Sequence, residues 1–145
     1  MKKIFAICIS SVILLTGFGQ VVVDTAGYDP ILVDVEVKPT WKGCDQKNDS
    51  LRKLCFENRL NGFFDDFIIY PEMAKKKKVE GQVLVQFVVE KDGSISNIQI
   101  IHDIGEGCGD EVVRAIKHLP KLIPGMDKGA AVRVVYRAPF NFVLK

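Results

Sequence analysis

The sequence has few of the residues on which most enzymes and metal sites depend. Its 145 residues include two histidines and one tryptophan. His102 and His118 are too far apart to form a common zinc motif. No cysteine pair has the C-x-x-C spacing of a thioredoxin-like redox site, and no G-x-S-x-G turn marks a serine nucleophile. We therefore expect no enzymatic activity, no metal ion and no cofactor.

The chain also lacks a marked net charge. It carries 20 basic and 18 acidic side chains. Removal of Lys2 and Lys3 with an N-terminal leader would leave 18 of each. Proteins that bind nucleic acid through bulk charge need a clear basic excess. We therefore expect no nucleic-acid partner.

A long apolar run is absent as well. The longest one, residues 4–18, is shorter than the roughly 20 residues that comfortably span a bilayer. Lys2 and Lys3 precede it, and Gly17 and Gly19 lie at the −3 and −1 positions of a cut before residue 20. This pattern predicts a cleaved signal peptide over residues 1–19 and a periplasmic protein. The alternative is an inner-membrane anchor formed by residues 4–18.

Three cysteines remain after cleavage of the leader, which contains Cys8. Outside the cytoplasm, cysteines tend to form disulfides. Cys44 and Cys55 would close the shortest loop, so we predict a disulfide between them. Cys108 is then left over and is interpreted as a small buried residue near a helix start.

Residues 20–69 are interpreted as an N-terminal extension with a helical segment. Residues 31–37 alternate as a strand does, so residues 20–40 are either a loose arm or an extra strand on a sheet edge. Residues 41–69 are predicted to be helical, with buried stripes before and after Asn61-Gly62. We expect that Asn-Gly pair to interrupt the helix.

Residues 70–145 alternate between helix and strand signals. Pro71 suits the first turn of a short helix, and Asp92-Gly93 suits a hairpin turn. Pro139 predicts that the last strand ends before it or continues only as an edge. The segments expected are a helix from 71, strands over 82–90 and 95–102, a helix from 110 to 119 and a strand over 131–136. The predicted fold class is α+β, a three-stranded antiparallel sheet with two helices packed on one face.

In order and spacing, the second half resembles the TonB C-terminal domain family. The matching residues are Tyr70-Pro71, Ala74, Glu80-Gly81-Gln82-Val83, Val85, Phe87, Asp92-Gly93 and Pro124-Gly125. The resemblance covers residues 70–145, and it divides the chain into a signal peptide (1–19), an extension (20–69) and a TonB C-terminal domain (70–145).

The resemblance implies a protein-binding function. Domains of this family pair a sheet edge with a short peptide, the TonB box, of an outer-membrane transporter in energy-coupled transport. This is β-strand addition, in which backbone hydrogen bonds hold the peptide. Carried over, the accepting edge is the third strand, Arg133, Val134, Val135, Tyr136 and Arg137. The start of the first strand, Glu80, Gly81, Gln82 and Val83, is expected near the partner. A homodimer formed by strand exchange is a further expectation.

The sequence departs from a full energy transducer in two respects. Such a protein has a membrane anchor with a functional histidine and a long proline-rich arm. Residues 4–18 contain no histidine, and residues 20–69 contain no long proline-rich stretch. The alternative function is therefore a periplasmic adaptor or a structural interaction module for another envelope protein.

Overall fold

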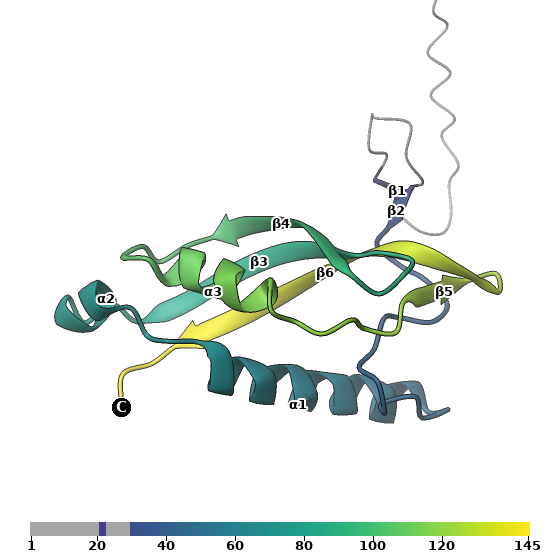
Figure 1. Ribbon diagram of the computed structural model, residues 1–145, viewed down its shortest axis with the longest axis horizontal. Coiled ribbons are helices and arrows are strands. Elements are labelled where there is room, and N and C mark those ends of the chain that lie inside the picture. The colour runs from purple at the N-terminus through teal and green to yellow at the C-terminus, as the bar shows by residue number, and fades with distance from the viewer. Residues whose placement is uncertain (1–20, 23–29) are drawn as a thin grey trace, which may run out of the picture.

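The computed structural model describes residues 21–22 and 30–145. The described helices are α1 (Asp49–Phe67), α2 (Glu72–Lys76) and α3 (Cys108–Ile116). The described strands are β1 (Val21–Val22), β2 (Ile31–Leu32), β3 (Gly81–Val89), β4 (Ile95–His102), β5 (Gly125–Asp127) and β6 (Ala130–Phe142). Figure 1 shows α3 lying over the sheet and α1 running alongside β6.

The centre of the sheet is the predicted three-stranded antiparallel unit. β3 pairs with β4 on one side and with β6 on the other, in the order β1-β2-β6-β3-β4. The α+β fold class is therefore confirmed. The sheet is nevertheless mixed, because β2 runs parallel to β6. Of the two interpretations of residues 20–40, the structure has the extra edge strand, at Ile31–Leu32.

One face of the sheet carries the core. Every second residue of β3 is fully buried: Val83, Val85, Phe87 and Val89. All three helices contribute to the same hydrophobic cluster, including Phe56, Leu60 and Phe64 of α1, Ala74 of α2, and Val112 and Ile116 of α3. The extension therefore shares the core with the elements that follow it.

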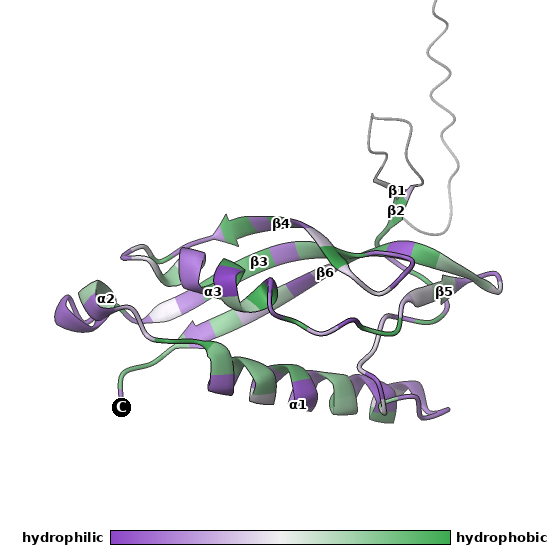
Figure 2. Cartoon of the chain, viewed as in Figure 1, coloured by the Kyte–Doolittle hydropathy of each residue, from purple (hydrophilic) through white to green (hydrophobic). Residues whose placement is uncertain are grey.

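The helix α1 is continuous, which corrects the expected interruption at Asn61-Gly62. It begins after Asn48, whose side-chain oxygen accepts the N–H of Leu51 at 3.1 Å. Its buried residues recur every fourth position on both sides of Gly62. An interior glycine costs about 1 kcal/mol, and burial of this aromatic face outweighs that cost. In Figure 2, α1 accordingly carries both hydrophobic and hydrophilic residues.

The strand β6 is longer than predicted and runs through Pro139. Its ladder with β3 extends in unbroken register from Val89↔Val134 to Gly81↔Phe142, with Leu84 opposite Pro139. Proline cannot donate to a ladder, so it fits a strand whose N–H at that position faces away from the neighbour. Pro139 therefore marks an open side of β6, and the predicted end at 136 was too early.

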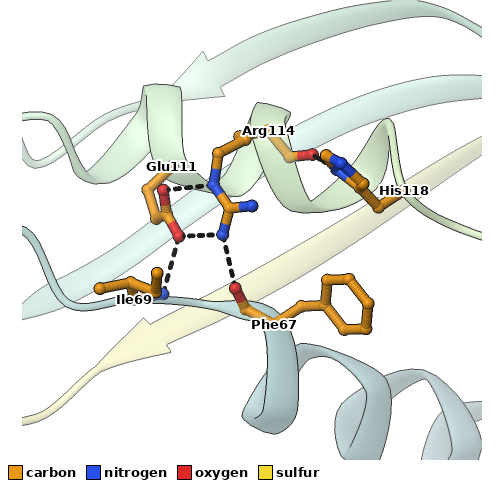
Figure 3. Close-up of polar contacts among 5 residues, drawn as sticks. All are labelled: Phe67, Ile69, Glu111, Arg114 and His118. Atoms are coloured by element: carbon orange, nitrogen blue, oxygen red, sulfur yellow. Dashed lines mark hydrogen bonds and ion pairs between the residues drawn. The ribbon is translucent and has the colours of Figure 1, made fainter.

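The end of α1 is clasped to α3 by one arginine. Arg114 donates to the Phe67 carbonyl at 2.6 Å and to both Glu111 carboxylate oxygens, while Glu111 Oε1 accepts the N–H of Ile69 at 2.7 Å (Figure 3). The hydrogen bonds from Arg114, followed by that from Ile69, lower the pKa of Glu111. This clasp satisfies a carbonyl that the end of α1 leaves without a helical partner.

No helix in the described part of the chain is both long and apolar enough to cross a membrane. The predicted signal peptide, residues 1–19, and the alternative anchor, residues 4–18, lie outside the described residues.

Candidate functional site

The candidate site is the outer edge of β6, the edge that faces away from β3. β2 pairs with this strand only at Arg133 and Val134. From Val135 to Phe142, β3 is the only described strand that pairs with β6. The predicted accepting stretch, Arg133 to Arg137, is therefore part covered and part open.

The alternation of the ladder tells which backbone groups face outward. In an antiparallel pair, successive residues direct their N–H and C=O alternately toward the partner and away from it. Pro139 fits only an outward position. By the same parity, Arg137 and Val135 turn their backbone groups outward, because the register with β3 is continuous through them. No described strand pairs with the outward main-chain donors and acceptors of these two residues.

The two arginines of this stretch are held from the face of the sheet opposite the core. Arg137 donates from Nε to Gln86 Oε1 at 2.8 Å, and Arg133 donates from Nε to Glu90 Oε2 at 2.8 Å. Burial raises the pKa of Glu90, but the hydrogen bonds from Arg133 and Ser96 outweigh it and bring the pKa below its ordinary value. These guanidinium groups therefore bind neighbours on β3 or just after it.

The other side chains of the stretch point inward or are partly covered. Val134 is buried, and the ring of Tyr136 contacts Phe56 edge-to-face at 5.3 Å and Phe87 at 5.5 Å. Burial, and then the negative charge of Glu57, raises the pKa of Tyr136 to about 12. The tyrosine is thus neutral at physiological pH and acts through packing. The outer edge accordingly presents mainly backbone.

A groove of about 500 Å³ lies beside this edge. Its walls are residues 35–40 of the extension, the first half of α1 and residues 136–137 of β6. Charged residues of the helix wall are paired with each other, Arg52 with Asp49 at 2.6 Å and Lys53 with Glu57 at 3.7 Å. Sequence reasoning missed the groove. Phe56 lies in the predicted buried stripe before Asn61-Gly62 and is buried, but no local pattern indicates that residues 35–40 lie opposite it.

The second candidate group, Glu80 to Val83, lies at the other end of the ladder. Gly81 pairs with Phe142, and the Gln82 amide donates to Asn141 Oδ1 at 3.0 Å. Glu80 Oε1 accepts the N–H of Leu144 at 2.6 Å. The residues of β3 opposite the accepting stretch are instead Gln86 to Val89. The structure therefore does not bring the two predicted groups together.

The structure contains the predicted disulfide. Cys44 and Cys55 are bonded, with their Cα atoms 5.6 Å apart, and Cys44 is fully buried. The bond ties the segment that forms one wall of the groove to α1. Cys108 is a buried free thiol, and burial, followed by the negative charges of Asp103 and Glu106, raises its pKa.

The described residues include no group of three histidine, cysteine or carboxylate side chains that could hold a metal ion. His118 lies on the surface with Nδ1 2.8 Å from the Arg114 carbonyl oxygen, where it belongs to the surroundings of the clasp. The arrangement beside β6 can bind an extended chain through its backbone.

Comparison with known proteins finds a family match for the second half of the chain. A family model described as Gram-negative bacterial TonB protein C-terminal matches residues 68–144. A protein named Protein TonB from Helicobacter pylori strain J99 is 30% identical over 77 residues, which are 52% of this chain and 26% of that protein. The Protein TonB of a second H. pylori strain is 35% identical over 54 residues, 34% of this chain and 19% of that protein. The chain thus matches about a quarter or less of the length of these relatives.

Two solved structures are similar to the chain, both NMR solution structures of the H. pylori TonB-CTD. The longer fragment is 25% identical with a TM-score of 0.47, covering 62% of this chain and 81% of that one. The shorter is 24% identical with a TM-score of 0.44, covering 61% and 94%. The family match spans more than half of the residues of this chain. The chain therefore belongs to the family of Gram-negative bacterial TonB protein C-terminal domains.

Proposed function

We propose that this chain is a periplasmic TonB-like protein whose β6 edge binds the TonB box of an outer-membrane transporter by β-strand addition, within energy-coupled transport. One observation carries the proposal: the outer backbone edge of β6 pairs with no described strand from Val135 onward, in a chain of the TonB C-terminal family. The proposal assigns the chain no enzymatic step.

The chemistry of the edge supports a peptide rather than a small molecule as ligand. Strand addition depends on main-chain groups, with side-chain pockets giving selectivity. Val135 and Arg137 offer outward main-chain groups, whereas Pro139 offers no N–H and limits the stretch at that end. The adjoining groove, with Phe56 and Tyr136 among its lining, would receive alternate side chains of the peptide.

The disulfide supports the proposed compartment. Bonds of this kind persist outside the reducing cytoplasm, and the Cys44–Cys55 bond ties the segment that follows residues 35–40 to α1, whose first half lines the groove. The periplasm is also the compartment in which this chain would encounter the TonB box of a transporter.

The test is a substitution that removes one outward donor and leaves the ladder with β3 in place. Val135→Pro is compared with Val135→Ala, which shortens the side chain but keeps the N–H. The ligands are synthetic peptides from the N-terminal segments of TonB-dependent transporters encoded in the same genome, and binding is measured by isothermal titration calorimetry. We expect Val135→Ala to bind like the parent, and Val135→Pro to bind at least about tenfold more weakly because a backbone hydrogen bond is lost.

Equal binding by a folded Val135→Pro chain would refute edge pairing. A pull-down from outer-membrane extract with the mature chain, residues 20–145, addresses the partner itself. Recovery of TonB-dependent transporters would support the proposal. Recovery of other envelope proteins without any transporter would contradict it and favour the adaptor or structural module.

A further inference from the structure

The strand β2 occupies part of the edge that the proposed peptide would use. Ile31 pairs with Arg133 and Leu32 with Val134, in parallel orientation. The Ile31 side chain is buried, with 6% of its surface exposed. Residues 35–40, which follow β2 along the chain, line the groove next to Tyr136 and Arg137. The chain's own extension therefore pairs with Arg133 and Val134 and lines the same groove as Tyr136 and Arg137.

The part of the extension that follows β2 is fixed by backbone hydrogen bonds and a disulfide. Val37 exchanges two backbone hydrogen bonds with Met126, at 2.9 and 2.8 Å, and Thr40 exchanges two with Ile123, at 3.0 and 2.8 Å. Thr40 is buried, and the disulfide at Cys44 follows. Displacement of the segment from residue 37 to Cys44 would therefore break several interactions at once.

Few backbone interactions connect β2 itself to β6. Its ladder with β6 covers two residue pairs. Val33 and Asp34, which join it to the anchored segment, are exposed and belong to no described strand. A bend at these two residues would release β2 while residues 37–44 keep their contacts. The weakly paired strand β2 and the firmly bonded segment 37–44 are thus close together in the sequence.

We propose that β2 is a built-in competitor strand, which covers Arg133 and Val134 in the resting chain and is displaced when an external peptide strand pairs along β6. This inference rests on the proposed function, because it concerns regulation of the same edge. The peptide then gains two further pairing positions next to the open stretch that begins at Val135. Residues 33–34 act as the hinge, and the disulfide-anchored segment keeps the displaced strand close by.

The competition has a measurable consequence. A ligand that binds only the open form has its apparent affinity reduced in proportion to the open fraction. Any substitution that favours the open form without touching β6 should therefore strengthen peptide binding. Ile31 is the buried residue of the two in β2, and it is outside the large hydrophobic cluster beneath the sheet.

The test compares Ile31→Asp with Gln46→Asp in the complete mature chain. Both variants add one negative charge to the extension, but Gln46 is exposed and lies outside the ladder, the hinge and the groove lining. Circular dichroism checks that both remain folded. With the transporter peptides of the previous experiment, we expect Ile31→Asp to lower the apparent Kd by about tenfold, and Gln46→Asp to match the parent.

Two outcomes would overturn the inference and leave the proposed function standing. They are unchanged or weaker binding by Ile31→Asp while the parent binds, and an equal gain in both variants, which would reflect charge alone. Hydrogen exchange adds a second measurement on the folded chains. The backbone amide of Arg133, which by the parity of the ladder faces away from β3, should exchange faster in Ile31→Asp than in Gln46→Asp, and equal exchange rates would contradict displacement.

Failure of the proposed function gives a different result. If no transporter peptide binds any variant, a synthetic peptide of residues 30–36 replaces it as the probe. Binding of this peptide to Ile31→Asp but not to the parent would support exchange of β2 on the edge without support for a transporter partner. No binding to either chain would overturn the competitor strand as well.

Discussion

At the scale of single residues, the arginines of the candidate edge are already bound within the sheet. In the sequence, Arg133 and Arg137 are the two charged residues at the ends of the predicted accepting stretch. In the structure they cross to Glu90 and Gln86. Their side chains hold neighbouring segments together, so peptide binding would depend on the backbone between them. The contact of Arg133 with Glu90 is the more buried of the two, with 12% and 23% of the side-chain surfaces exposed.

This ion pair predicts a dependence of stability on pH. The pKa of Glu90 is lower in the folded chain than its ordinary value of 4.5. A carboxyl of this kind stabilises the fold above its unfolded pKa, and the stabilisation is lost as pH falls through the folded pKa. Between pH 5 and pH 3, the free energy of unfolding should therefore fall by about 1–2 kcal/mol more in the parent than in Glu90→Gln. Urea unfolding at both pH values measures this difference.

Other carboxylates also contribute to the loss of stability at low pH. Only the difference between the parent and Glu90→Gln therefore reports on the Glu90–Arg133 pair. The pKa of Asp92 is lowered to about 2, mainly by hydrogen bonds from Ser94, and that of Glu111 is lowered mainly by Arg114. These effects remain in Glu90→Gln and cancel in the difference. Parallel pH profiles for parent and variant would mean that the Glu90–Arg133 pair does not stabilise the fold.

At the scale of elements, α1 is positioned by its two ends. The disulfide ties its first half to the segment that precedes it, and the clasp ties its last residue to α3. We expect Arg114→Ala to lower the free energy of unfolding and the urea midpoint below those of the parent, because it removes a carbonyl contact and an ion pair that is partly exposed. Arg59→Ala, an exposed arginine on α1, is the matched control.

Chemical denaturation of both variants gives the measurement. Equal loss in Arg114→Ala and Arg59→Ala would show that the clasp contributes nothing beyond a surface arginine. A larger loss confined to Arg114→Ala would support its role at the junction of α1 and α3.

The elements that the sequence predicted are those with a local signal. The alternation of Val83, Val85 and Phe87, followed by the turn at Asp92-Gly93, was sufficient for the hairpin of β3 and β4. Two residues cannot show a period, so β2 could be proposed only as one of two alternatives. The groove could not be predicted, because it depends on non-local placement of residues 35–40 against α1. At Pro139 the edge rule applied, but the strand continued because its other side pairs with β3.

At the scale of the whole molecule, the family match and the hydrophobic core have different boundaries. The match begins at residue 68, after the end of α1. The core already includes Phe56 and Phe64, which contact Tyr136 and Phe140 of β6 edge-to-face. The extension therefore covers side chains of the family-matched part. The groove is lined by residues of both the extension and β6, and β2 of the extension pairs with β6, so both features depend on this docking.

A shared core predicts that damage to α1 lowers the stability of the entire chain. Phe64 is 5% exposed, whereas Leu54 on the same helix is 54% exposed. Phe64→Ala should cost about 3–5 kcal/mol, and Leu54→Ala should stay within about 0.5 kcal/mol. Near-ultraviolet and far-ultraviolet circular dichroism should report one common urea transition for Phe64→Ala, at lower urea than the parent. If the sheet instead kept the parent's transition while α1 alone melted early, the extension would be a separate unit, and the groove beside β6 would exist only while it stays docked.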